Sequence, residues 1–315
     1  METYFGTYAY DTLRVVEFPD SEGTYATAFA NNLHLSEIRF VSNPGNDNDK
    51  IDLAYYVSSH ELIHHWWGST FIPARAKGAS MLTESITEYF SLKTYERFYG
   101  NARARDFLRL QHKRYWRGHN NESGMEPPLY LVESPQQYVS YGKGTVVLHA
   151  LSRIIGEETF NQILSDFYHA HKEAHPPYPT SLDFIHHLRN VLPDSLTAYV
   201  HEQFMAVNYF ENEITDARLT ASQDDYELEV NLKASKWGLD PSDREKQPQA
   251  LEVDDWMEIG FYDEQDQLLE TSWVKVASGN SFLTFTLKEK VARVQLDPHL
   301  LLLEKDREDN EWLLE

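Results

Sequence analysis

Hydrophobic and polar positions alternate strictly toward the C-terminal end of the chain. In DYELEVNLKA, residues 225–234, an apolar side chain occupies every second position, and the same period of two recurs in WMEIGFY and FLTFTL. Successive side chains of a β-strand point to opposite faces of its sheet, so this period predicts short strands with one buried face. Several such strands joined by polar loops are typical of a small all-β sandwich.

Between residues 51 and 210 the spacing of apolar positions is instead helical. Thr180 and Asp183 in TSLD predict a capping box at the start of one helix. Before residue 45, the stretches LRVVEF and HLSEIRFV are rich in β-branched and aromatic residues and predict strands, after which SNPGNDNDK predicts a loop. One more helix is predicted to end at Gly100, and its apolar stripe consists of Leu82, Ile86, Tyr89 and Phe90.

These patterns predict a protein of the α/β class, more narrowly α+β. The 315 residues, 41% of them hydrophobic, are enough to fill the cores of two domains. We expect a mainly helical domain at residues 1–213, a β-sandwich domain at 214–304 and a charged tail at 305–315.

The charge balance excludes several classes of partner. Lysine and arginine total 28 against 50 acidic residues, a formal net charge of −22. Nucleic-acid binding and docking on anionic lipid both depend on a basic face, so we expect no nucleic acid and no direct membrane contact. The absence of cysteine excludes disulfides, thiolate metal sites and cysteine nucleophiles. No apolar run approaches the roughly 18 residues that span a bilayer, which predicts a soluble chain.

The stretch HELIHHWWG, residues 60–68, places candidate chemistry on one helix. His60 and His64 are four residues apart, so both imidazoles project from the same face and can bind one ion. Glu61 lies about 100° further round the helix, where it can reach a water on that ion without being a ligand. This is the arrangement of the H-E-x-x-H zinc motif, and the alternative is a solvated helix that is rich in histidine.

A zinc ion bound by two histidines needs a third protein ligand and an open position for water. The next predicted helix offers Glu84 in MLTESITEYF, with Glu88 one turn later on the same face. We expect Glu84 to complete a site for one Zn²⁺ per chain, and Glu88 to accept the N–H of a histidine ligand. The alternative for Glu88 is an ordinary surface carboxylate.

HELIHHWWG followed by MLTESITEYF resembles the aminopeptidase-N family of zinc peptidases, the gluzincins that include leukotriene hydrolases. The resemblance implies that residues 1–213 are a thermolysin-like catalytic domain. The spacer from His65 to Thr83 has 19 residues, one more than is usual in the family, and we assign the extra residue to the loop PARAKGAS. This spacer, WWG and the later stretch KVARVQLDP are more similar to the peptidase domains fused to bacterial ABC-type transporter permeases.

The resemblance extends to a tyrosine that the family has in a Y-x-K-G turn over the zinc. YVSYGKGTVVLHAL matches that turn with Tyr141, and Tyr138 is the alternative. A phenol there can donate to the oxyanion that forms when water attacks a peptide carbonyl.

The family also has a G-x-M-E-N strand whose glutamate binds the free amine of the substrate. NLHLSEIRF has Glu37 at the corresponding place but lacks the glycine, the methionine and the asparagine. Glu37 is therefore either the amine anchor of an aminopeptidase or an ordinary carboxylate at the end of a strand.

Histidines outside the motif are expected to have other roles. His65 faces away from His64 and is expected to be structural. His171 and His175 have the spacing of metal ligands but no acidic residue at a useful position, which disfavours a second metal site. We also expect Trp66 and Trp67 to pack the zinc helix against its neighbours, and His186 and His187 to be solvated.

The sequence thus predicts a zinc-dependent metallopeptidase, aminopeptidase-like, that hydrolyses a peptide substrate with Glu61 as general base and Tyr141 as oxyanion stabiliser. The alternative is a catalytically weak or inactive zinc-containing module, binding or regulatory, of a larger protein associated with a membrane transporter. The family members have further domains, so we expect a soluble fragment, truncated at its N-terminus, of a bacterial polypeptide anchored by transmembrane segments. The side-chain preference, the oligomeric state and the compartment stay open.

Overall fold

The computed structural model describes residues 1–20, 26–37, 51–173, 175–222, 225–240 and 247–314. The chain divides into two units, Met1–Ala206 and Val207–Glu315. It contains both helices and sheets, which confirms the mixed class that the sequence predicts. None of the helices in the described residues combines the length and the apolar character needed to span a membrane.

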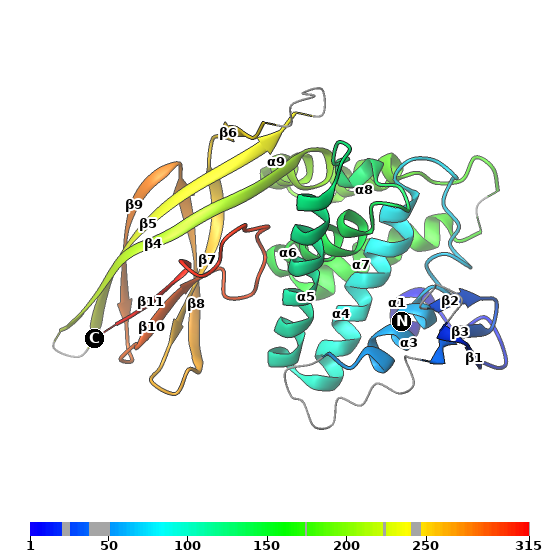
Figure 1. Cartoon of the computed structure of the whole chain (residues 1–315), viewed down its shortest axis with the longest axis horizontal. Helices are drawn as coiled ribbons and strands as arrows, with labels where there is room; N and C mark the ends of the chain where they lie inside the picture. The colour runs from blue at the N-terminus through cyan, green and yellow to red at the C-terminus, as the bar shows by residue number, and fades with distance from the viewer. Residues whose placement is uncertain (21–25, 38–50, 174, 223–224, 241–246, 315) are drawn as a thin grey trace. The chain divides into compact units, whose positions relative to one another are not determined.

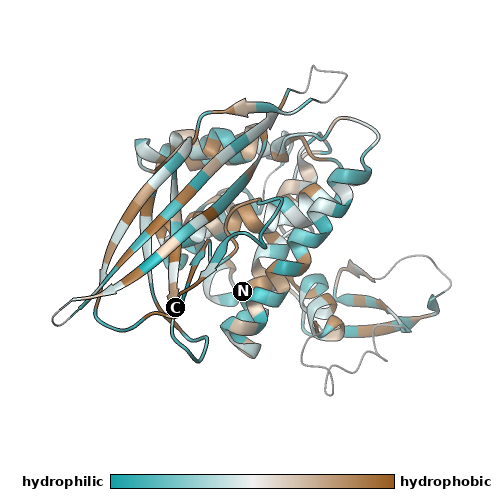
Figure 2. Ribbon diagram, turned by 60° about the vertical axis from the view of Figure 1, so that its left-hand side comes forward, coloured by the Kyte–Doolittle hydropathy of each residue, from teal (hydrophilic) through white to brown (hydrophobic). Residues whose placement is uncertain are grey.

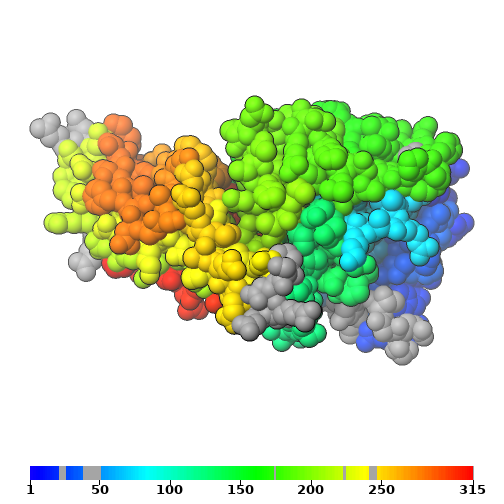
Figure 3. Space-filling view, turned by 90° about the horizontal axis from the view of Figure 1, so that it is seen from above, coloured from blue at the N-terminus to red at the C-terminus, as the bar shows by residue number. Residues whose placement is uncertain are grey.

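The first unit is built mainly from helices packed around α4, Ile86–Tyr99 (Figure 1). α4 contacts α3 (Leu53–Ile63), α5 (Asn101–Asn121) and α6 (Gly144–Ile155), and its apolar face is buried among them. Further helical segments are α1 (Glu2–Phe5), η3 (Met81–Ser85), η4 (Leu129–Leu131), η5 (Tyr138–Lys143), α7 (Glu157–His171), α8 (Ser181–Val191), η6 (Asp194–Leu196), α9 (Thr197–Val200) and η7 (His201–Met205). In the space-filling view, green residues of α7 and α8 form part of the surface of this unit (Figure 3).

Local sequence signals set the ends of these helices. The side chain of Asp52 caps α3 by accepting from the Tyr55 N–H at 3.0 Å. α4 ends before Gly100, whose φ of 83° lies in the left-handed region that favours glycine. Thr180 and Asp183 make both hydrogen bonds of the predicted capping box at the start of α8. The predictions of the Gly100 and Thr180 boundaries are confirmed.

A small sheet with the strand order β1–β3–β2 lies beside α3. β1 (Arg14–Phe18) runs parallel to β3 (Asn32–Ser36), and β2 (Ala26–Phe29) runs antiparallel to β3. β1 falls within the predicted strand LRVVEF, and β3 overlaps the start of HLSEIRFV, whose last four residues lie outside the described residues.

In the second unit, two sheets enclose one apolar core. Brown and teal residues alternate along β4 and β5 in Figure 2, because one face of each strand is buried in that core. Leu228, Val230 and Leu232 supply the buried face of β5, as the period of two predicts. One sheet consists of β4 (Val207–Ala221), β5 (Tyr226–Leu239), β6 (Gln249–Leu251) and β9 (Gly279–Leu287), and the other of β11 (Glu311–Leu313), β10 (Arg293–Leu296), β7 (Asp254–Tyr262) and β8 (Leu268–Ala277).

The division between the units lies before Val207, earlier than the boundary expected after residue 213. That expected boundary falls inside β4, which pairs with β5 from Val207 to Ala221 with one irregularity after Ile214. The residues expected as a charged tail also belong to the second unit, because β11 pairs with β10 and the side chain of Asn310 is buried. Both differences follow from the pairing of strands across a sheet, which neither the periodicity nor the charge of a single segment reveals.

A buried carboxylate in the second unit makes its stability depend on pH. Glu304 accepts from the backbone N–H of Asn212 at 2.5 Å and from its Nδ2 at 2.7 Å. Burial nevertheless raises the pKa of Glu304 from 4.5 to about 7, against the opposing effects of Arg307 and Asn212. Between these values the folded protein binds more protons than the unfolded chain, so its stability falls as the pH rises from about 4.5 to about 7.

Glu304 should contribute up to roughly 3 kcal/mol to the unfolding free energy that the protein loses between pH 5 and pH 8. We therefore expect Glu304→Gln to make this loss smaller. Urea unfolding at both pH values, followed by tryptophan fluorescence, measures this difference. Glu308→Gln is the matched control, because Glu308 is exposed on the same segment. Equal pH dependence in the parent and in Glu304→Gln would contradict the assignment.

Candidate metal centre

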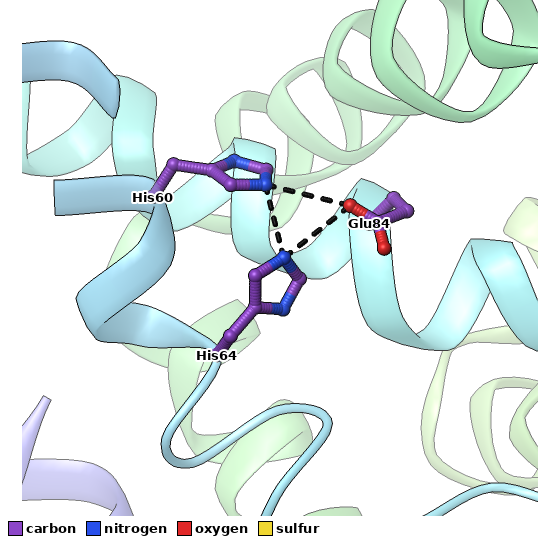
Figure 4. Close-up of side chains that lie close together, drawn as sticks. All are labelled: His60, His64 and Glu84. Carbon is purple, nitrogen blue, oxygen red and sulfur yellow. Dashed lines mark hydrogen bonds and ion pairs between the residues drawn. The ribbon is translucent and has the colours of Figure 1, made fainter. Parts of the chain in front are cut away.

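Two histidines of α3 face one point. His60 lies in the last turn of the helix and His64 directly follows it with α-helical φ and ψ. Their spacing of four places both rings on one side, with the two Nε2 atoms 3.0 Å apart (Figure 4). The structure thus brings together the two imidazoles that the spacing of four places on one face of the helix.

Glu84 approaches the same point from η3, a π-helical turn at the start of the next helix (Figure 4). Its Oε2 lies 3.4 Å from the Nε2 of His60 and 3.4 Å from that of His64. Among the described residues, these three form the group of histidine and acidic side chains that could hold a metal ion. Two imidazole nitrogens and one carboxylate oxygen are donors that suit zinc and leave a fourth position open, so the residues fit that ion.

The cluster is strongly coupled electrostatically. Burial lowers the pKa of His60, but Glu84 and Glu88 outweigh burial and raise it to about 10. Burial raises the pKa of Glu84, yet hydrogen bonds with His60 and His64 hold it well below the usual range. A cation that binds here therefore competes with a proton, and its binding releases that proton.

Each imidazole also has an acceptor at its other nitrogen. The Nδ1 of His60 is 3.1 Å from the Oε1 of Glu88, and the Nδ1 of His64 is 2.9 Å from the carbonyl oxygen of Trp67. These acceptors favour the tautomer with the proton on Nδ1, which directs the Nε2 lone pairs toward the shared point.

Glu88 is completely buried and is satisfied by other donors. Tyr56 donates from its hydroxyl to Oε1, and Gln111 donates from Nε2 to Oε2 at 3.0 Å. Arg114 donates from Nη1 to the Tyr56 hydroxyl at 3.3 Å and to Gln111 at 3.1 Å. Two side chains thus hold the buried carboxylate directly, and Arg114 in turn holds both of them.

Glu61 follows His60 on α3 and is buried. Burial raises its pKa, and the neighbouring imidazoles of His60 and His64 partly offset that effect. The backbone of Ala28, in the edge strand β2 that packs against α3, also lowers the pKa of Glu61.

Tyr141, in η5, donates its phenolic hydrogen to the Oε2 of Glu84 at 2.6 Å. Its ring stacks on that of His60, with centroids 5.4 Å apart, and the Cζ of Arg114 lies 5.0 Å from the ring centroid. Burial and then the charge of Glu84 raise the pKa of Tyr141, so the phenol stays protonated and can donate. Tyr138 instead donates to Glu122 at 3.3 Å, so Tyr141 is the tyrosine that lies at the cluster.

Glu37 lies outside the cluster. Its exposed side chain is at the end of β3, where Oε1 accepts from the backbone N–H of Asp20 at 3.2 Å. A neighbouring hydrogen bond joins Ser36 to the carboxylate of Asp20 at 3.1 Å, so two acidic groups meet at this strand end.

The remaining histidines and tryptophans have structural contacts. His65 is buried, with its Nε2 2.8 Å from the carbonyl oxygen of Phe29, and Trp67 is buried against Phe5 and Phe71. His187 is only partly exposed, with its Nε2 3.1 Å from the Ile163 carbonyl oxygen, which differs from the solvated position that the sequence suggested.

A family model described as the peptidase family M1 domain matches residues 1–204 of this chain. The chain belongs to peptidase family M1. This agrees with the resemblance to aminopeptidase-N-like gluzincins, whereas nothing in the match concerns a transporter. M1 metallopeptidases use zinc, the ion that the donor set fits.

Among solved structures, this M1 chain is similar to a mutant M1 zinc metallopeptidase from Deinococcus radiodurans bound to a Tyr-Ser-Ala substrate. The two are 18% identical over 64% of this chain and 41% of that one, with a TM-score of 0.45. A second structure of the same mutant gives a TM-score of 0.47 at 18% identity, over 64% of this chain and 42% of that one. This chain therefore spans about two fifths of the length of these M1 structures. No curated protein matches it.

The geometry predicts an order of effects on metal affinity. Glu84→Ala removes a donor atom and should abolish stoichiometric zinc binding, whereas Glu88→Ala should weaken affinity by about 10- to 100-fold by releasing His60. Competition with a chromophoric chelator measures both constants. Glu96→Ala, on the same helix but paired with Lys93, is the control that should bind zinc like the parent. A larger loss for Glu88→Ala than for Glu84→Ala would exchange the two assignments.

Proposed function

We propose that this chain is a zinc-dependent peptidase of aminopeptidase type, in which His60, His64 and Glu84 hold one zinc ion. The observation that supports this role most directly is the convergence of their three donor atoms within 3.4 Å of one another. Zinc supplies Lewis acidity there, which makes water more acidic and a peptide carbonyl more electrophilic.

Glu61 and Tyr141 supply the proton chemistry in this proposal. Glu61 accepts the proton of the attacking water and delivers it to the leaving amine, because it adjoins His60 on α3 without joining the ligand set. Tyr141 donates its phenolic hydrogen to the oxyanion that develops on the carbonyl, for which its protonated state and its place beside Glu84 are suitable.

We propose Glu37 as the anchor for the free amine of the substrate. Its carboxylate is exposed at the end of β3, in the sheet that packs against α3, the helix of His60 and Glu61. Asp20 adds a second carboxylate at that place. Two acidic groups favour an ammonium group, which is the feature that distinguishes an aminopeptidase substrate from an internal peptide bond.

A second candidate is a catalytically weak or inactive zinc module within a larger protein associated with a membrane transporter. The strand NLHLSEIRF favours it, because the glycine, methionine and asparagine that accompany the glutamate in the family are all missing. The resemblance of the spacer, WWG and KVARVQLDP to permease-fused peptidase domains supports the same parent. Glu61 and Tyr141 favour the active enzyme instead, because a site without catalysis has no need of either.

Glu61→Gln tests the choice between these candidates. On zinc-loaded protein and fluorogenic aminoacyl amides, we expect the rate to fall by roughly 10²- to 10⁴-fold while zinc content stays unchanged. Glu133→Gln, at an exposed position, is the control. A parent chain no faster than Glu61→Gln on free and N-blocked peptides alike would favour the inactive module. Cleavage of blocked but not free substrates would leave an endopeptidase and remove the role of Glu37.

Tyr141→Phe should lower kcat by roughly 10²- to 10³-fold with little change in KM, because the lost donor acts on the developing oxyanion. Tyr138→Phe is the matched control, since its hydroxyl bonds to Glu122 instead. Steady-state kinetics on one aminoacyl amide compares the two variants. Equal losses in both would mean that neither phenol is the specific donor.

A further inference from the structure

Glu84 and Tyr141 both lie in π-helical turns, η3 and η5. Such turns are rare, and they interrupt the regular ladder of helical hydrogen bonds. In an α-helix the N–H of Gly144 would donate to the carbonyl of Ser140, four residues earlier. Here that N–H donates to the carbonyls of Val139 and Tyr141, so the Ser140 carbonyl loses its α-helical donor.

Ser85 supplies a replacement donor from the other π-turn. Its Oγ donates to the carbonyl oxygen of Ser140 at 2.6 Å, and both serines are buried. Ser85 directly follows Glu84, and Ser140 directly precedes Tyr141. One hydrogen bond therefore joins the backbone beside the candidate ligand to the backbone beside the candidate oxyanion donor.

The second glycine of YGKG, Gly144, makes this contact possible. A Cβ on Gly144 would lie 2.2 Å from the Oγ of Ser85 and 2.5 Å from its Cβ, distances that side chains do not tolerate. The φ of Gly144 is −57°, an ordinary helical value, so this glycine is needed for space rather than for its backbone freedom. Glycine inside a helix is unfavourable, so a glycine there usually has a packing or functional reason, and at Gly144 the reason is the close approach of Ser85.

We propose that Ser85 is a positioning residue that joins the two π-turns and so sets the distance between Glu84 and Tyr141. This proposal rests on the proposed function, because the position of Tyr141 matters for the rate only if its phenol donates to the oxyanion. The phenolic oxygen lies 2.6 Å from the Glu84 carboxylate, and catalysis is sensitive to small displacements of such a donor. Without the Ser85 hydroxyl the buried Ser140 carbonyl loses this hydrogen bond, and η5 loses its link to η3.

Ser85→Ala tests the kinetic consequence. We expect kcat to fall by about 10-fold with KM and zinc affinity within about twofold of the parent, because only the alignment of Tyr141 changes. Ser91→Ala is the matched control: Ser91 is also buried, and its Oγ donates to the Thr87 carbonyl at 2.8 Å within α4 alone. A loss of kcat in Ser91→Ala equal to that in Ser85→Ala would overturn the proposal, since destabilisation of the helix would then explain both.

An exchange of the two residues tests the contact without any assay of activity. On metal-free protein, Gly144→Ala should lower Tm by roughly 5–10 °C, and the double variant Ser85→Gly, Gly144→Ala should recover most of that loss. Helix propensity largely cancels in the exchange, so recovery reports the steric contact. A Gly144→Ala variant that is as stable as the parent, or no recovery in the double variant, would contradict the packing.

The outcomes separate this proposal from the proposed function. If Tyr141→Phe loses its rate while Ser85→Ala keeps the full kcat, the positioning role is wrong and the peptidase stands. If Tyr141→Phe keeps the full rate, the role of the phenol in the proposed function is wrong. The kinetic role of Ser85 then falls with it, although the exchange still decides whether the two turns are joined.

Discussion

The interaction on which the first unit depends is the contact of two imidazoles with two carboxylates in a largely buried place. Burying these groups singly is unfavourable, because each loses the water that solvates it. Here Glu84 lies beside both His60 and His64, and Glu88 lies beside His60, so each buried group has a polar partner in place of water. The packing of α3 against α4 and the turn that carries Glu84 must keep these groups together, with a metal ion or a proton in between.

Much of the fold could be predicted from periodicity and from helix-end signals. The alternation in DYELEVNLKA predicted β5, and the capping residues of TSLD predicted the start of α8, because these signals act within a few residues. The division before Val207 could not be predicted in the same way. It depends on the pairing of β4 with β5, a contact between segments whose register only the folded sheet reveals. The charge of residues 305–315 likewise concealed the pairing of β11.

The candidate site likewise has parts that local sequence signals predict and parts that depend on contacts between distant segments. A spacing of four on a helix was sufficient to bring His60 and His64 together, and Glu84 was expected from the need for a third ligand on the next helix. Tyr141 was expected only from a family resemblance. The side chains around Glu88 had no sequence signal at all. Tyr56 lies on α3, and Gln111 and Arg114 lie on α5. They meet at Glu88 only because α3, α4 and α5 pack on one another. Their role as hydrogen-bond partners becomes clear only once Glu88 is known to be buried, because a buried carboxylate needs such partners.

A sequence comparison alone does not reveal where the backbone accommodates the extra residue between His64 and Glu84. From spacing alone the loop PARAKGAS was the natural place for it, since loops tolerate insertions. A π-helical turn contains one residue more than the α-helical turn that it replaces, and η3 is such a turn at Met81–Ser85. The helix itself therefore offers a second place for the residue, one that leaves the phase of α4 after Ser85 unchanged. An insertion absorbed there acts directly on the direction of the Glu84 carboxylate, whereas one absorbed in the loop does not.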